Sequence, residues 1–127
     1  MSQVIEMSLV RCDGSPDGPS EMVRIAVDRS VIDERLVACT EEVLEAGRAR
    51  GLHLAADQDA YGAVTYLQKI TAGQFFVYVG NPDRLEEHVF GPGDWVGFID
   101  NRGLGHASKV GPEGCTRMFH LLRGQLG

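Results

Sequence analysis

The fold expected from this sequence depends on residues 30–51, which read SVIDERLVACTEEVLEAGRARG. Apolar residues recur in this segment at i, i+4, i+7 and i+11, and they are Ile32, Leu36, Cys39 and Val43. On an α-helix this spacing places all of them in one stripe. The segment therefore predicts an amphipathic helix whose apolar stripe packs against the rest of the domain.

Both ends of this helix carry residues that commonly begin or end one. Ser30 can act as the N-cap, and Asp33 three residues later is an acidic variant of the capping box. Arg50 lies in the last turn, and Gly51 can supply the left-handed cap. We expect one long helix over about residues 31–50.

The segment before this helix has the pattern of a β-hairpin. Val4–Val10 and Met22–Val27 each alternate apolar and other residues, as a strand with one buried face does. Residues 13–20 between them are turn-forming and predict an exposed loop.

The segment after the helix is aromatic, rich in glycine and divided by turns. No Phe, Trp or Tyr precedes residue 61. The expected strands are Ala63–Ile70, Gln74–Val79, Trp95–Ile99 and Thr116–Leu122, with a weaker one at His88–Phe90. Residues 61–70 fit helical spacing almost as well, so strand and helix both stay open there.

The expected fold class follows from these three segments. We expect a single globular α+β domain over residues 1–127. It would consist of an N-terminal β-hairpin, one long amphipathic helix and a C-terminal antiparallel β-meander.

The charge of the chain limits its partners and its location. The 127 residues include 18 acidic and 12 basic side chains, a net charge of -6. An acidic chain of this kind predicts that nucleic acid is not a partner. No apolar run reaches the length of a membrane span, and the first residues lack a signal-peptide pattern, so we expect a cytoplasmic protein that does not bind membranes.

The excess acidic charge is concentrated in the first half of the chain. Residues 1–60 hold twelve acidic and six basic side chains, whereas residues 61–127 hold six of each. On the expected helix, Glu34, Glu41 and Glu45 lie together opposite the apolar stripe, and Glu42 flanks them. Such a face is either a solvated surface or a site that steers a basic partner.

These observations favour a non-enzymatic protein that covers a basic protein surface, as an inhibitor or immunity-type protein does. The sequence holds no nucleophile elbow, phosphate loop or dinucleotide fingerprint, so we expect no cofactor. A further alternative is a subunit of a larger assembly or a homo-oligomer, with the loop at residues 13–20 as a contact arm.

A second hypothesis concerns the histidines. His88, His106 and His120 lie on or near the expected strands, and they could form a metal site only by converging from separate strands. Unpaired histidines more often sit singly on strand faces and in loops.

One stretch near His106 resembles the second conserved motif of the cupins. Residues 91–99 read GPGDWVGFI, and residues 101–106, NRGLGH, end in His106. The resemblance implies a small β-barrel that binds a ligand or a metal, or acts as an enzyme, with His106 as a metal ligand. Asn101 replaces the motif's proline, and nothing upstream matches the family's first motif.

Overall fold

The computed structural model describes residues 3–15, 18–54, 58–59, 62–101 and 103–127. Residues 16 and 17 of the expected contact arm, and Tyr61, lie outside these ranges. The described residues are mainly β-strand, which corrects the expected α+β class. None of the described helices is long and apolar enough to cross a membrane.

The N-terminal hairpin is present in the position expected from the sequence. β1 (Val4–Cys12) pairs antiparallel with β2 (Ser20–Asp28) in unbroken register. Ile5, Met7 and Leu9 all point to a buried face of β1, as their alternation predicts.

The long helix expected over residues 31–50 is wrong. The structure has a short helix, α1 (Arg29–Arg35), followed by β3 (Leu36–Leu44) and β4 (Ala49–His53). Its N-cap is Asp28, whose side chain accepts hydrogen bonds from the backbone N–H and the hydroxyl of Ser30 at 3.0 and 2.9 Å. Ser30, the expected N-cap, therefore lies inside the helix.

The apolar stripe fails because only its first member is buried. Ile32 is 1% exposed, whereas Leu36 is 39% and Val43 is 77% exposed. From Leu36 onward the chain runs antiparallel to β9 (His106–Arg123), so its backbone hydrogen bonds go to a neighbouring strand. Helix spacing is a weak predictor where such a partner is available, because tertiary pairing overrides local propensity.

The C-terminal part is not a simple meander. Its central strand is β6 (Gly62–Val79), so the described residues of 61–70 form a strand. β6 pairs with β9 and β8 (Trp95–Phe98) and with β7 (Glu86–Phe90), and its first residues pair with β5 (Gln58–Asp59). The main sheet order is β2-β1-β8-β6-β9-β3, and β1 runs parallel to β8. The expected antiparallel meander is therefore corrected to a mixed sheet.

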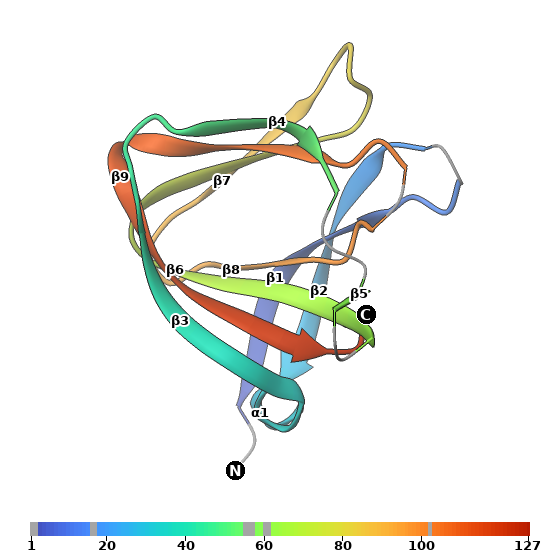
Figure 1. The fold of residues 1–127 in the computed structure, drawn as a ribbon, viewed down its shortest axis with the longest axis vertical. Helices are drawn as coiled ribbons and strands as arrows, with labels where there is room; N and C mark the ends of the chain where they lie inside the picture. The colour runs from blue at the N-terminus through green and yellow to red at the C-terminus, as the bar shows by residue number, and fades with distance from the viewer. Residues whose placement is uncertain (1–2, 16–17, 55–57, 60–61, 102) are drawn as a thin grey trace.

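β6 and β9 are long strands that bend together and fold the sheet over itself (Figure 1). Their register shifts between Ile70 and Ala72 and again between Gly73 and Phe75. Gly73 has a φ of 75°, and a Cβ there would overlap the carbonyl group of Gly114 on β9. Before the bend β6 pairs with β8, and after it with β7, so the bend creates two layers.

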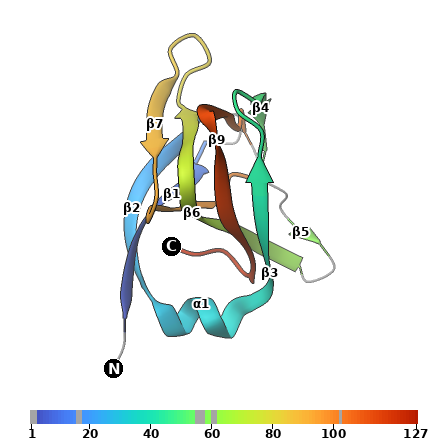
Figure 2. The same ribbon diagram turned by 90° about the vertical axis from the view of Figure 1, so that its left-hand side faces the viewer.

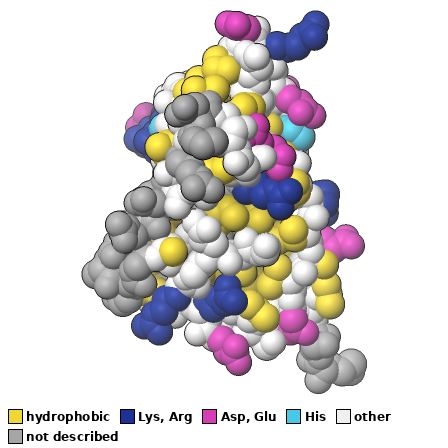
Figure 3. Space-filling model, turned by 90° about the vertical axis from the view of Figure 1, so that its right-hand side faces the viewer, with side chains coloured by type: hydrophobic (Ala, Val, Ile, Leu, Met, Phe, Trp, Pro, Cys, Tyr) yellow, Lys and Arg dark blue, Asp and Glu magenta, His cyan; other side chains and the backbone are white. Residues whose placement is uncertain are grey.

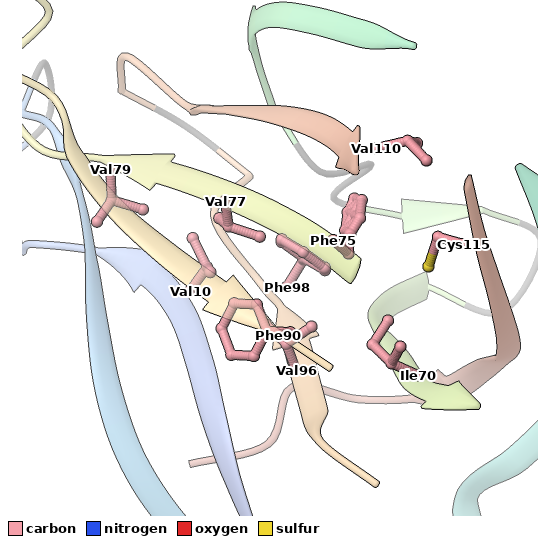
Figure 4. Close-up of a cluster of buried hydrophobic side chains, with 10 residues drawn as sticks. All are labelled: Val10, Ile70, Phe75, Val77, Val79, Phe90, Val96, Phe98, Val110 and Cys115. Carbon is pink, nitrogen blue, oxygen red and sulfur yellow. The ribbon is translucent and has the colours of Figure 1, made fainter. Parts of the chain in front are cut away.

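The layers enclose one apolar cluster, and α1 covers a second. The cluster between the layers is drawn in Figure 4 and consists of Val10, Ile70, Phe75, Val77, Val79, Phe90, Val96, Phe98, Val110 and Cys115. Figure 2 shows α1 crossing one end of the sheet between β2 and β3. Its Ile32 joins Met7, Leu67 and Leu122 in the second cluster. After the bend in β6, Phe75, Val77 and Val79 are buried and alternate with half-buried residues, as in a strand with one face on the core.

Candidate functional site

A cavity of about 480 Å³ lies between the two layers. Its walls come from β3 and β4, from both halves of β6 and β9, and from Phe98 on β8. The aromatic side chains in its wall are Tyr66, Phe75, Phe98 and Phe119, and the titratable ones are Glu42, Arg48, Arg50, His53, His106 and Arg117. The bend in β6 and β9 brings these residues together.

His106 is held at one end of the cavity by a buried carboxylate. Asp100 is fully buried, and its Oδ2 lies 2.5 Å from His106 Nδ1. The same oxygen accepts a hydrogen bond of 2.7 Å from the hydroxyl of Ser20. Phe98 stacks on the His106 ring with centroids 4.6 Å apart. The carboxylate and the aromatic ring together fix the orientation of this imidazole.

His53 lies against His106 from the neighbouring strand. The two residues are paired between β4 and β9, and their ring centroids are 4.3 Å apart. His53 Nδ1 donates to the carbonyl oxygen of Gly51 at 2.8 Å. Gly105 has a φ of 78°, and a Cβ there would overlap the His53 backbone. A glycine before His106 therefore lets the two strands approach closely enough for the imidazoles to touch.

Burial lowers the pKa of His53 below its ordinary value of 6.5. The Gly51 carbonyl and Asp100 oppose this effect on the pKa, while His106 and Arg50 reinforce it. His53 is therefore a neutral imidazole at neutral pH, with Nδ1 as the donor and Nε2 as the acceptor.

Arg117 crosses another part of the cavity wall and is bound on several sides. Its guanidinium donates to Glu42 at 2.8 and 2.7 Å and to the side-chain oxygen of Gln68 at 2.5 Å. It also lies over the rings of Phe75 and Phe119, at 5.7 and 5.0 Å from their centroids. These contacts make Arg117 a structural part of the wall rather than a free cation.

Arg48 and Arg50 line the cavity and are exposed to solvent. Within the described ranges neither guanidinium has an ion-pair partner, while Glu42 is already bound to Arg117. The wall as described thus carries three guanidinium groups against one carboxylate, although the chain as a whole is acidic. The cavity therefore favours a negatively charged occupant.

The structure separates the three histidines proposed as metal ligands. His106 faces the cavity, His88 lies on β7 across β6 from β9, and His120 faces the opposite side of β9 from Arg117 and Phe119. No three His, Cys, Asp or Glu side chains in the described part of the chain lie close enough to hold a metal ion. His88 contacts Glu86 instead, with Nε2 and Oε1 3.5 Å apart.

His120 lies beside the cluster under α1 and contacts its Trp95. Its ring lies 5.3 Å from that of Trp95, and its Nδ1 is 3.2 Å from the Leu67 carbonyl oxygen. Burial lowers its pKa below 6.5, and the charges of Arg29 and Lys69 lower it further, against the opposing effect of backbone hydrogen bonds.

His120 should make the stability of the protein depend on pH. Because its pKa is lowered in the folded state, the unfolded chain binds the proton more readily, so stability falls as the pH drops below 6.5. In His120→Gln the loss of unfolding free energy between about pH 7.5 and about pH 5.5 should be smaller than in wild type. Urea denaturation at both pH values measures this difference, and an equal loss in both proteins would contradict the prediction. The His53 contribution remains in the variant.

The four glutamates expected on one helix face do not share a face. Glu34 is exposed on α1, Glu41 is exposed on β3, and Glu45 is exposed in the turn before β4. Glu42 points to the other side of β3, into the cavity wall. On the face drawn in Figure 3 the acidic side chains are scattered rather than gathered in one patch. Capture of a basic protein stays a prediction, without the helix face on which it was based.

Sequence reasoning singled out His106 but missed the residues that surround it. His53 and Arg50 lie on β4, Asp100 lies in the loop before β9, and Arg117 lies far along β9, so no single local motif connects them. One usable signal was the pair Gly103 and Gly105 just before His106, since both have positive φ and mark a close approach of two backbone segments.

Comparison with protein-family models and with curated proteins finds no match for this chain.

Proposed function

We propose that this protein binds a small organic anion with an aromatic or other apolar portion. The observation that carries the proposal is the cavity between the two layers. It combines four aromatic side chains with two guanidinium groups that have no ion-pair partner among the described residues.

The size and the lining of the cavity suit a small molecule. Ligand pockets commonly measure about 300–1,000 Å³ and combine apolar walls with a few polar groups that orient the ligand. At about 480 Å³ this cavity is within that range. The ring centroids of Tyr66 and Phe119 are 5.5 Å apart, and the ring of Phe98 stacks on that of His106. These rings provide apolar surface beside the polar groups of the cavity.

The charge of the cavity selects for an anion. Arg117 is already bound to Glu42 and Gln68, so the attraction is expected to come from Arg48 and Arg50. A carboxylate can accept paired hydrogen bonds from a guanidinium, and such charge-assisted bonds are stronger than neutral ones.

The test compares two probes of nearly equal size, 3-phenylpropionate and the uncharged 3-phenylpropanol. Isothermal titration calorimetry should show tighter binding of the anion to wild-type protein. In Arg50→Gln the affinity for the anion should fall about 10-fold, as expected for losing one charge-assisted hydrogen bond. The affinity for the alcohol should change little.

Arg84→Gln is the matched control, because Arg84 is exposed in the turn between β6 and β7 and does not line the cavity. This variant loses the same charge and should bind the anion like wild type. Equal binding of both probes to wild type, or an equal loss of affinity in Arg84→Gln, would contradict an anion site in the cavity. If wild-type protein binds neither 3-phenylpropionate nor 3-phenylpropanol, the proposal is overturned.

A further inference from the structure

We propose that the cavity is also a proton-transfer site, in which His106 removes a proton from the carbon next to the carbonyl group of a bound 2-oxo carboxylate. This inference rests on the proposed binding of an organic anion. It adds a reaction, enolisation, and a substrate class to that function.

The hydrogen bonds of His106 leave one ring nitrogen to act as a base. A carboxylate can only accept, so in the neutral ring Nδ1 carries the proton that binds Asp100, and Nε2 carries a lone pair. Asp100 itself is fixed, because the Ser20 hydroxyl binds the same carboxylate oxygen from β2. Among the described residues its other oxygen, Oδ1, has no hydrogen-bond partner although it is buried. The hydrogen-bond partners of the Asp100 side chain among the described residues are therefore His106 and Ser20, both at Oδ2.

This arrangement stabilises the ring after it has taken up a proton. When Nε2 is protonated, His106 becomes a cation beside the buried carboxylate, which is 2.5 Å from Nδ1. His53, the closest other imidazole, stays neutral because burial lowers its pKa, so no second positive charge opposes the new one. Asp100 acts through His106 and is a positioning residue.

Arg50 can stabilise the charge that develops on the substrate. It lies on β4 close enough to His53 for its charge to lower the pKa of that imidazole, and it lines the same cavity. The electron pair of the broken C–H bond forms the C=C bond of the enol, and the carbonyl oxygen takes up the negative charge. A guanidinium beside that oxygen favours the enolate. Return of the proton from His106 completes the cycle, with no net oxidation or reduction.

The cavity is less suited to acyl transfer, which needs an activated nucleophile. Ser108 is the serine in the described wall, and it lies two residues from His106 on the same strand. Residues two apart on one strand have Cα atoms about 6.5–7 Å apart. Within the described ranges the Ser108 hydroxyl makes no hydrogen bond to His106, whose Nδ1 binds Asp100 instead. Proton transfer needs only the base, its carboxylate and a cation, and all of them are present.

The experiment uses phenylpyruvate, an aromatic 2-oxo acid whose CH₂ protons lie next to the carbonyl group. Loss of the CH₂ signal in D₂O, followed by proton NMR, measures enolisation, and calorimetry measures binding separately. Wild-type protein should exchange these protons faster than protein-free buffer. His106→Asn should bind phenylpyruvate and lose at least about 100-fold in the exchange rate, the usual contribution of a general base.

Two further variants separate catalysis from a structural effect. Asp100→Asn should lower the exchange rate more than the affinity, because Nδ1 of His106 loses the carboxylate that holds the ring in place. A loss of folding alone would lower the exchange rate and the amount of binding together. His120→Gln also removes a buried histidine from β9, but on the side away from the cavity, and should exchange like wild type.

The outcomes distinguish this inference from the function on which it rests. Binding of phenylpyruvate by wild type without faster exchange would overturn proton transfer and leave anion binding intact. Faster exchange that persists in His106→Asn would also overturn it, as would an equal loss in His120→Gln. Failure of wild type to bind phenylpyruvate or 3-phenylpropionate would overturn both proposals.

Discussion

Replacing Gly73 with alanine is expected to lower the free energy of unfolding by about 3 kcal/mol or more. Gly73 has a φ of 75°, a conformation that costs free energy for any residue with a Cβ. The added Cβ would also overlap the backbone carbonyl of Gly114 on the neighbouring strand, which cannot rotate away as a side chain could. Since β6 and β9 bend together at this point, the strain would fall on the fold of both layers.

Chemical denaturation of Gly73→Ala beside Gly91→Ala tests this prediction. Gly91 precedes β8, does not have a positive φ, and a Cβ there would meet no atom within 4 Å. Gly91→Ala should therefore unfold close to wild type. Equal stability of the two variants would show that the strands do not depend on Gly73 to bend.

Replacing Arg117 with methionine is expected to lower the free energy of unfolding by about 2 kcal/mol. The change leaves Glu42 without its cation and the side-chain oxygen of Gln68 without its donor. Gln68 is fully buried, so its lost hydrogen bond is not replaced by water. The expected cost is below that of a fully buried ion pair, because the Glu42 side chain is 39% exposed and retains part of its solvation.

A double-mutant cycle with Glu42→Gln isolates the contribution of the ion pair. If Arg117 stabilises the wall mainly through Glu42, the double variant should be more stable than the sum of the two single losses predicts. Denaturation of the four proteins at one pH provides the comparison. Strict additivity would mean that Arg117 acts through Gln68 and the aromatic rings alone.

The strands of this protein could be predicted where burial is one-sided. At the start of β1, Ile5 and Met7 are buried and alternate with the exposed Val4 and Glu6, because one face meets the cluster under α1, and the expected hairpin was right. The segment after α1 could not be predicted in the same way. Val43 is at helix spacing from Ile32, yet it lies on an exposed face of an edge strand, where an apolar residue carries no information about the core.

A local signal against the long helix was present at Gly47. It has a φ of 73° and lies in the turn between β3 and β4, where the backbone N–H of Arg48 bonds to the carbonyl of Glu45. A glycine inside a helix pattern costs stability relative to alanine and commonly marks an end or a turn. The apolar spacing and the apparent cap at Gly51 favoured the helix nonetheless.

The candidate site was less predictable than the strands. His106 was identified through its turn and through a partial resemblance to a cupin motif, but the other members of the cavity wall were not. His53 and His106 are far apart in the sequence. Their rings touch because β4 pairs with β9. Contacts of this range depend on strand pairing, which residue spacing does not encode.

The sequence by itself determined which side chains this protein carries and several of its local backbone conformations. Alternating apolar residues set the hairpin, glycines set the turns, and the order of the chain set the excess of acidic charge in its first half. The tertiary structure decided where the chemistry lies. Pairing of residues 36–53 with β9 replaced a helix by two strands and dispersed the glutamates, because interstrand hydrogen bonds outweigh a weak local preference. The bend of β6 and β9 then gathered arginines, aromatic rings and two histidines around one cavity.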